Sequence, residues 1–287
     1  MKPTIMRFLL VIAVCSCVQA AVATSSNLQF HVLQVPGASR TVAYGLNNLG
    51  QIVGTYTAAG VGHGFLYDSG VFTTIDDPQG TGTLVTGIND GSEVVGYSSA
   101  RGFSELNGVY TSISYPGSKA TFPSSVNNSG DIVGSYDDGQ GKQHGFLFSN
   151  GVYTTIDPPN SAVTLLGGIN NNRIIAGTVC LSTTGKCHGF IYSQGRFAYV
   201  TYPGSVGTQV LGLNDAVDLA GDEDSASGLE NDFTYSTVTG KFVGFEVANS
   251  RDTAAYGINN SGEVVGFFTQ GATFSGYYLQ PTAVQNK

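Results

Sequence analysis

One short motif recurs along this chain at a nearly constant interval. Gly-Ile-Asn, or a close variant of it, ends at asparagines that lie 42, 38, 43, 44 and 45 residues apart: Asn47, Asn89, Asn127, Asn170, Asn214 and Asn259. Self-similarity at a fixed period of roughly 20–50 residues is the signature of a repeat architecture. The chain must therefore fold as copies of one small unit.

Each unit holds three further elements in a fixed order. An apolar pair closed by glycine follows the asparagine, as at residues 132–134, and then comes His-Gly-Phe, as at residues 144–146. The fourth element is aromatic and β-branched, as at residues 153–157. Glycine and asparagine separate these runs, and both adopt the positive φ of tight hairpins. The pattern predicts four short antiparallel strands per unit.

Four-stranded units of this length are the size of β-propeller blades. The chain has 40 glycines in 287 residues and only 11% charged residues, unlike a helical bundle, and its 41% apolar content excludes a disordered chain. We therefore expect an all-β fold, a single six-bladed β-propeller over residues 24–287. A β-solenoid, a β-sandwich and a ring of five or seven blades are the alternatives.

The order of the motifs also predicts how the ring closes. The first strand, at residues 28–35, resembles the fourth element of a unit, whereas the last strand, at residues 275–279, resembles the third. The N-terminal strand should therefore pair with the C-terminal blade. Such closure removes the exposed sheet edges that invite aggregation.

These motifs resemble those of the extracellular HAF-repeat family of bacterial proteins, which is named for a His-Ala-Phe motif. This chain has His-Gly-Phe instead, in three copies that begin at His63, His144 and His188. The similarity extends over nearly all of the chain after residue 23. It implies a secreted bacterial protein with a repeat fold. It implies no catalytic residues, because the family has none that can be carried over.

The first 23 residues have the pattern of a secretory signal peptide. Lys2 and Arg7 precede a short apolar run at residues 8–14, and small residues then allow cleavage near Ala20 or Ala23. The apolar run is too short to cross a membrane as a helix. The sequence thus predicts secretion, either to the periplasm or to the exterior. A lipid anchor at Cys17 is the alternative.

The rest of the chain is acidic. Removal of residues 1–23 leaves 10 basic and 20 acidic residues, so the net charge changes from −8 to −10. Such a surface does not attract nucleic acid or anionic lipid, and no second apolar stretch is long enough to span a membrane. We expect a monomer that binds neither nucleic acid nor membrane.

Two cysteines, Cys180 and Cys187, lie beyond the predicted signal peptide. In an oxidising compartment such a pair forms a disulfide, which here would close a short loop. A metal site is the alternative, but it needs further ligands, and only His188 adjoins the pair. The sequence therefore predicts a Cys180–Cys187 disulfide.

The recurrent histidines and asparagines each have two interpretations. The histidines of His-Gly-Phe stand on different blades, too far apart for the roughly 2.0 Å bonds of one shared zinc, so we expect hydrogen-bonded structural residues. Asn127 and Asn259 lie in Asn-Asn-Ser-Gly turns, where a calcium loop would need several more carboxylates. Capping of the hairpin by an Asx turn explains them more simply.

The least repetitive segment, residues 222–232, contains five acidic residues. A solvated acidic loop is one interpretation. The other is a weak Ca²⁺ site, since carboxylate oxygens are the ligands that Ca²⁺ prefers. Its ligands would be Asp222, Asp224, Glu230 and Asp232. No other cofactor is predicted.

Strand order divides the loops between two faces of the ring. The loops between second and third strands open on the same face as the links between blades, and we call this the variable loop face. The tight turns open on the opposite face, the turn face. Variable loops on a rigid frame are where binding usually resides, so the predicted binding residues lie on the first face: Tyr115, Tyr202, Asp137 and Asp138. The alternative for the two tyrosines is packing over blade junctions.

The sequence contains no Gly-x-Ser-x-Gly, His-Glu-x-x-His or phosphate-loop motif. We therefore expect a non-enzymatic binding or scaffold module for a glycan or protein ligand. The alternative is a propeller-type hydrolase or lyase that acts on a polysaccharide or a small ester, because propellers host both roles. An enzyme would need carboxylates that converge in one pocket.

Overall fold

The computed structural model describes residues 28–182, 185–226, 228, 230–247, 250 and 252–281. These residues form 24 β-strands joined by turns and short loops, with no helix among them. Within this part of the chain, therefore, no helix is long and apolar enough to span a membrane. The predicted signal peptide, residues 1–23, lies outside the described residues. The prediction of an all-β fold is confirmed.

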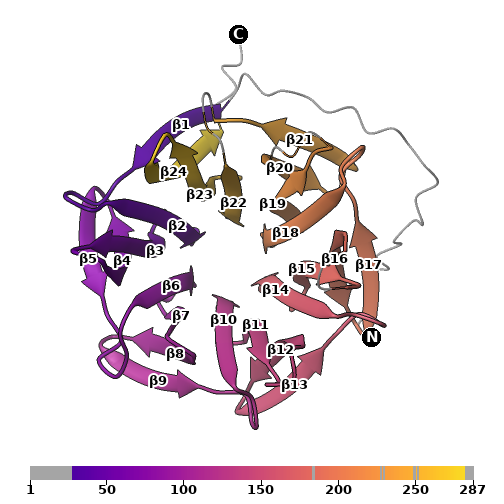
Figure 1. The fold of residues 1–287 in the computed structure, drawn as a ribbon, viewed down its shortest axis with the longest axis horizontal. Helices are drawn as coiled ribbons and strands as arrows, with labels where there is room; N and C mark the ends of the chain where they lie inside the picture. Colours follow the sequence, from indigo (N-terminus) through magenta and orange to yellow (C-terminus); the bar gives the residue numbers. More distant parts are fainter. Residues whose placement is uncertain are drawn as a thin grey trace, which may run out of the picture.

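The strands occupy four recurring positions between the centre of the molecule and its rim (Figure 1). The innermost strands are β2 (Arg40–Leu46), β6 (Thr83–Ile88), β10 (Ala120–Val126), β14 (Val163–Ile169), β18 (Gly207–Leu213) and β22 (Thr253–Ile258). The second strands are β3 (Ile52–Ala58), β7 (Val94–Ser98), β11 (Ile132–Asp137), β15 (Ile175–Cys180), β19 (Asp218–Asp224) and β23 (Val264–Gln270). The third strands are β4 (Val61–Asp68), β8 (Arg101–Leu106), β12 (Gln143–Ser149), β16 (Cys187–Ser193), β20 (Glu230–Ser236) and β24 (Thr273–Pro281). The outermost strands are β5 (Val71–Ile75), β9 (Val109–Ile113), β13 (Val152–Ile156), β17 (Arg196–Val200), β21 (Lys241–Phe245) and β1 (Leu28–Leu33).

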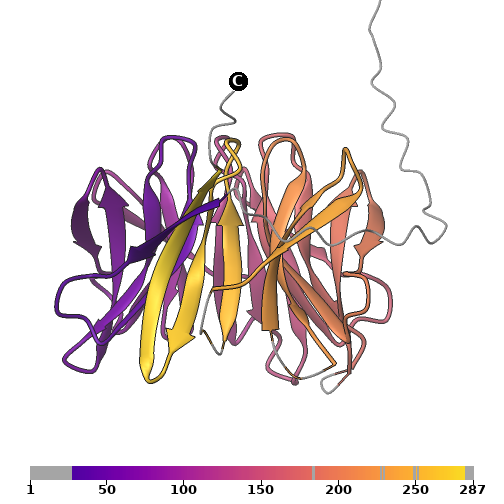
Figure 2. The same ribbon diagram turned by 90° about the horizontal axis from the view of Figure 1, so that it is seen from above.

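Neighbouring strands pair antiparallel into four-stranded units, which stand side by side around a central axis (Figures 1 and 2). Each unit runs from the axis to the rim, so its two faces pack against the units beside it. The hairpins have the predicted turn chemistry. In the β12–β13 turn, for example, Asn150 and Gly151 have φ values of 50° and 79°.

The first strand pairs with the last one. β1 lies antiparallel to β24, with Leu28 opposite Pro281 and Leu33 opposite Gly276. The unit of β22, β23 and β24 thus takes its outer strand from the beginning of the described chain. This is the pairing that the order of the motifs predicts.

The recurrent glycine of the second strands is required by the neighbouring backbone. A Cβ atom on Gly54 would lie 2.0 Å from the carbonyl oxygen of Val42 on β2. The register shifts by one residue at this level, between Ala43 and Gly45 of β2. From the sequence, this glycine could be required either by a β-bulge or by a close approach of the neighbouring backbone. The structure shows the close approach, and the bulge lies in the inner strand.

The hydrophobic core lies between neighbouring units rather than in one central mass. Phe103 of β8, for example, packs with Val85 of its own inner strand and with Val53 of the preceding unit. The equivalent aromatic residues are all at most 1% exposed: Phe65, Phe103, Phe146, Phe190, Phe233 and Tyr277. Full burial of such a side chain contributes about 1.5–3 kcal/mol, so each unit stabilises its neighbours.

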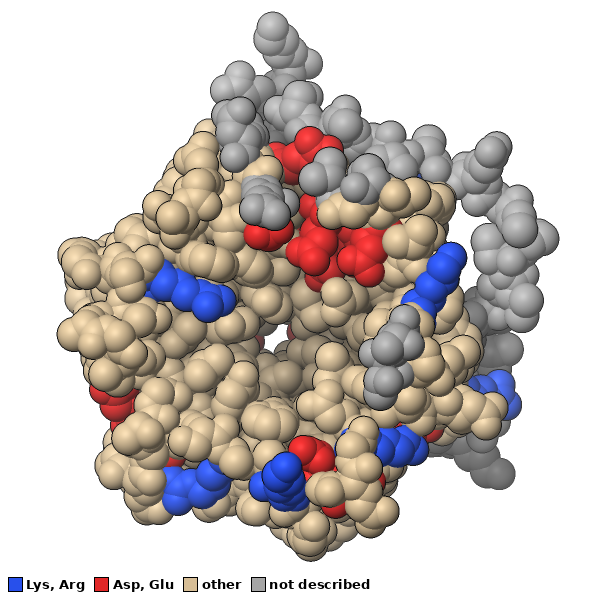
Figure 3. Space-filling view, in the orientation of Figure 1, with Lys and Arg blue, Asp and Glu red and all other residues tan. Residues whose placement is uncertain are grey.

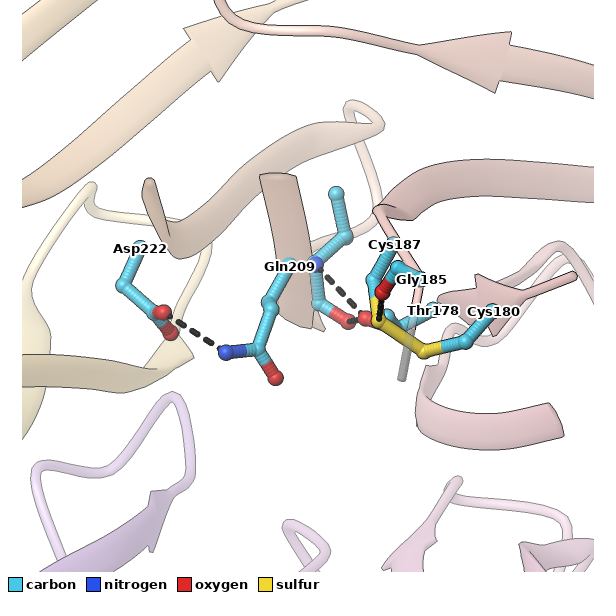
Figure 4. The surroundings of a disulfide bond; sticks show 7 residues. Thr178, Cys180, Gly185, Cys187, Gln209 and Asp222 are labelled. Carbon is cyan, nitrogen blue, oxygen red and sulfur yellow. Dashed lines mark hydrogen bonds between the residues drawn. A yellow bond between two sulfur atoms is a disulfide. The ribbon is translucent and has the colours of Figure 1, made fainter. Parts of the chain in front are cut away.

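Cys180 and Cys187 form the predicted disulfide, at facing positions of β15 and β16 (Figure 4). We expect replacement of both cysteines by serine to lower the free energy of unfolding by about 2 kcal/mol, because a short closed loop restricts the unfolded chain only a little. In a chain of this size the melting temperature should fall by roughly 4–8 °C, which calorimetry measures. Reduced wild-type protein is the control and should match the variant. A loss above about 5 kcal/mol would show that the bond supports more than one hairpin.

Candidate functional site

Several exceptions to the repeat gather at one junction, between the unit of β18–β21 and the unit of β22–β24. Asp232 on β20 takes the place that glycine holds in the neighbouring His-Gly-Phe motifs. Tyr277 on β24 takes the place of phenylalanine. We call Gln209, Asp222, Asp232 and Tyr277 the acid junction.

A side chain fits at position 232 because the facing residue is small. On Gly189, the equivalent glycine of the preceding unit, a Cβ atom would lie 2.4 Å from Cγ2 of Val210 on the next inner strand. The residue equivalent to Val210 beside Asp232 is Ala255 on β22. The Asp232 carboxyl group therefore has room between the two units, where it is completely buried.

Asp222 replaces a hydroxyl residue that bridges two units elsewhere. At the equivalent position of β15, Thr178 Oγ1 accepts a hydrogen bond from Val210 N at 3.0 Å. Asp222 instead accepts one from Gln209 Nε2 at 3.0 Å, and Gln209 itself stands where other units have an apolar residue (Figure 4). Asp222 lies directly opposite Asp232 in the β19–β20 pair. Two buried carboxyl groups therefore share this junction.

Only one oxygen of the Asp232 carboxyl group has a well-formed hydrogen bond. The hydroxyl of Tyr277, which is itself fully buried, donates to Asp232 Oδ2 at 2.8 Å. The hydroxyl of Thr253 and the backbone N–H of Ala255 lie near this carboxyl group and lower its pKa, but Oδ1 and the Thr253 hydroxyl do not reach the geometry of a full hydrogen bond. An unsatisfied buried oxygen costs about 1–3 kcal/mol, and native proteins retain few such groups.

The junction raises the pKa values of its acids. Burial raises the pKa of Asp232 to about 7, although the hydrogen bond from Tyr277 opposes this shift. Burial raises the pKa of Asp222 well above its usual range, and the nearby carboxylates of Asp232, Glu230 and Asp224 raise it further. The two facing carboxyl groups therefore disfavour each other's ionisation.

Further acids lie beyond this junction, toward the variable loop face. Asp224 and Glu230 pair across β19 and β20, toward the loop that joins these strands. Figure 3 shows acidic side chains gathered over this part of the face. Among the described residues, no ion pair involves Asp222, Asp224, Glu230 or Asp232. Within the part of the chain that the structure describes, the patch therefore carries negative charge without a basic partner.

The four predicted Ca²⁺ ligands thus occupy one strand pair, two in the buried junction and two nearer the loop that joins the strands. Across residues 28–281, leaving aside the gaps given above, no three His, Cys, Asp or Glu side chains are grouped so that they could hold a metal ion. The Ca²⁺ site stays a prediction.

Contacts within the fold account for Asp137, Asp138 and Tyr115. The two carboxylates cap the β11–β12 hairpin, where Asp137 Oδ1 and Asp138 Oδ1 accept the amide N–H groups of Gly139 and Gln140, both at 2.7 Å. Tyr115 stacks on Tyr136 with ring centroids 3.7 Å apart. These residues lie on the predicted face.

Tyr202 serves packing, the alternative that the sequence left open. It is only 9% exposed and lies in the core beside Phe233 and Phe242, with ring centroids 5.6 and 5.1 Å away. Its backbone N–H donates to Thr208 Oγ1 at 2.9 Å, which fixes the link between two units. A ring held in this way offers a ligand little surface.

The histidines of two His-Gly-Phe motifs are hydrogen-bonded structural residues, as predicted. His144 Nδ1 lies 2.5 Å from Asp157 Oδ2, and its ring stacks on Tyr136. His63 Nδ1 lies 2.9 Å from Asp76 Oδ2 in the same arrangement. Each histidine thus ties a third strand to the residue that follows the fourth.

The recurrent asparagines connect neighbouring units, which the sequence analysis did not predict. Asn170 Oδ1 accepts the amide N–H groups of Asn172 and Ile174, as an Asx turn requires. Its Nδ2 also donates to the carbonyl oxygen of Asn214 in the next unit, at 3.2 Å. The other recurrent asparagines make the same contact. The constant spacing of these residues was the only signal in the sequence.

Comparison with known proteins gives the fold but no family. No family model matches the chain, and no curated protein is significantly similar to it. Among solved structures it is similar to a luciferin-regenerating enzyme, with a TM-score of 0.54 and 11% identity over 90% of this chain and 96% of that one. It is also similar to TolB from Acinetobacter baumannii, with a TM-score of 0.54 and 12% identity over 90% of this chain and 65% of that one. Both are β-propeller proteins, so the chain has a β-propeller fold. Membership of the HAF-repeat family stays a prediction.

Proposed function

We propose that this propeller has six blades and that β1 closes its ring. Two series of hydrogen bonds around the axis support this number. In the first, each recurrent asparagine donates to the next, and Asn259 Nδ2 reaches back to the carbonyl oxygen of Asn47 at 3.2 Å. In the second, the residues that follow these asparagines are linked in the same order, and Asn260 N donates to Asn48 Oδ1 at 2.9 Å.

We also propose that the protein is secreted, to the periplasm or the exterior. The Cys180–Cys187 disulfide supports this location, because such bonds persist in oxidising compartments and are rare in the cytosol. The signal peptide predicted at residues 1–23 agrees with it. N-terminal sequencing of protein recovered from a bacterial host should find a chain that begins just after Ala20 or Ala23.

We propose that the protein is a non-enzymatic binding module whose ligand carries positive charge. The observation behind this proposal is the acidic patch on the variable loop face, which has no basic partner among the described residues and lies next to a non-repeated junction. A concentrated negative field attracts a cationic partner and speeds its association. Ammonium or guanidinium groups of a protein or glycan have the complementary chemistry.

Binding of a hexalysine peptide, followed by calorimetry at low ionic strength, tests this proposal. The paired substitution Asp224→Asn and Glu230→Gln should weaken binding by roughly tenfold, since it removes two of the exposed charges. Added salt should have a similar effect on the wild-type protein. Glu105→Gln, on the turn face, is the matched control and should leave affinity unchanged. Equal affinity of the paired variant and the wild type would contradict the proposal.

The buried carboxyl pair favours a second candidate, a hydrolase or lyase. A general acid must hold its proton at the working pH and reach the substrate; the raised pKa of Asp232 meets the first condition, and the second requires a substrate that gains access to this buried carboxyl group. Turnover of a polysaccharide or small ester that is lost in Asp232→Asn, while the variant stays folded, would assign catalysis to this pair. Activity that survives the substitution would place any catalytic group elsewhere.

A further inference from the structure

A pocket of about 300 Å³ lies where the last unit meets the first, between β24 and the strands β2–β4. We call it the seam pocket. It opens among the tight turns of the first unit, on the face opposite the acid junction. The side chains that line it include Leu49, Tyr67, Asp68, Glu263, Tyr278 and Gln280.

Two of these residues depart from the repeat. Leu49 follows the recurrent asparagine by two places, where other units have small or polar residues, and it is 67% exposed. Tyr278 stands directly after the buried aromatic position, where Leu66 and Leu147 stand in other units. Large side chains thus border this seam where the repeat does not require them.

Glu263 lacks the basic partner that an equivalent residue has. In another unit, Arg173 binds the equivalent carboxylate, Asp131, through Nε and an NH2 group, both at 2.7 Å. At the seam, the residue equivalent to Arg173 is Gly50, which has no side chain to reach Glu263. No positive charge faces Glu263 among the residues that line the pocket.

Neutral amides hold the two pocket carboxylates in place. Asn259 Nδ2 and Gln280 Nε2 donate to the two oxygens of Glu263, both at 2.7 Å. Gln51 and Ser69 hydrogen-bond to Asp68, which lowers the pKa of that carboxyl group. Each carboxylate oxygen can accept a further hydrogen bond. The pocket therefore offers fixed acceptors that are already ordered before a ligand arrives.

The two tyrosines provide aromatic surface and hydroxyl groups. The Tyr278 ring stacks on His31 of β1 at 4.5 Å, and the Tyr67 ring packs against Phe72 at 4.8 Å. Burial raises the pKa of Tyr278, and Tyr67 and Glu263 raise it further, so these groups lie close together. Within the described part of the chain, neither phenol hydroxyl is hydrogen-bonded. Both are available to a ligand.

We infer that the seam pocket binds one sugar residue of a glycan. Its carboxylates accept hydrogen bonds from sugar hydroxyls, its phenols can donate as well as accept, and its rings offer an apolar surface to the C–H face of a pyranose. A pocket of this size is at the lower end for small-molecule sites and suits a single ring. An ammonium ligand would use the carboxylates but not the phenol donors. This inference is independent of the acidic patch, which lies on the other face.

Saturation-transfer NMR on the intact protein tests the inference with glucose, galactose, fucose and N-acetylglucosamine, each at about 10 mM. At least one sugar should receive saturation. Tyr278→Leu, which restores the side chain of equivalent positions, and Glu263→Gln should each weaken that sugar's binding by roughly tenfold. Glu93→Gln is the matched control, since Glu93 occupies the equivalent place in another unit, and it should bind as the wild type does.

Each of three other outcomes overturns the inference. Absence of transfer to all four sugars in folded wild-type protein excludes a site of useful affinity. Transfer that persists in both variants places the sugar elsewhere. Transfer to choline but to none of the sugars assigns the pocket to an ammonium ligand. The hexalysine experiment reports on the opposite face, so the two proposals can fail separately.

Discussion

Replacing Asn170 by alanine should lower the free energy of unfolding by about 3 kcal/mol. The side chain is 4% exposed, and it accepts two amide N–H groups of its own turn while it donates to Asn214 in the next unit. Alanine would leave those groups without partners in a place that water barely reaches. Urea denaturation followed by circular dichroism measures the loss.

The substitution Asn170→Asp separates the two roles of this side chain. Aspartate keeps the oxygen that caps the turn but has no donor for the carbonyl group of Asn214, so it should cost roughly 1–2 kcal/mol. Gln140→Ala, on an exposed hairpin, is the control and should change stability by less than about 0.5 kcal/mol. If aspartate proves as stable as asparagine, the contact between units contributes nothing. If it costs as much as alanine, the cap contributes little.

The strands were predictable because each type recurs along the chain, so a degenerate copy can be aligned with intact ones. Asn231, Asp232 and Phe233 retain little of His-Gly-Phe, yet they form the third strand of their unit as β20. The order of the motifs likewise predicted the partner of β1. What the repeat could not show is a contact between units, such as Asn170 with Asn214, because the two residues are far apart in the sequence.

The candidate sites were predictable only in part. Asp222 and Asp232 lie in one acidic segment of the sequence and were therefore predicted as ligands. Gln209 and Tyr277 lie on two other strands, β18 and β24, outside that segment. Only an alignment of the copies marks Tyr277 as an exception. The seam pocket was missed for a different reason. It forms where the two ends of the chain meet, at turns that the sequence analysis treated as uniform.

Asp232 should make the protein less stable as the pH rises. Its pKa is about 7 in the folded protein, against about 4 for an unfolded chain, so the folded state keeps a proton that the unfolded state releases. The contribution of Asp232 to stability is therefore largest below about pH 4, falls between about pH 4 and pH 7, and is constant above that range. At about 1.4 kcal/mol per pKa unit, the loss amounts to roughly 4 kcal/mol.

The substitution Asp232→Asn should abolish this dependence. Asparagine keeps the shape of the side chain and an oxygen for the Tyr277 hydroxyl, so the variant should match the wild type near pH 4 and exceed its stability by up to about 4 kcal/mol at pH 8. Urea unfolding at both pH values measures the difference.

Asp138→Asn provides a control of opposite sign. Hydrogen bonds from backbone amides, chiefly that of Gln140, lower the pKa of Asp138, so its charge stabilises the fold above about pH 4 and is lost on acidification. This variant should therefore be less stable than the wild type at pH 8 and equally stable at low pH.

If Asp232→Asn is no more stable than the wild type at pH 8, other groups stabilise the ionised carboxylate of the wild-type protein in solution. Hexalysine should stabilise both proteins, since Asp224 and Glu230 remain in the variant, and a gain that shrinks when it is added would show that the peptide binds the ionised wild-type site more tightly.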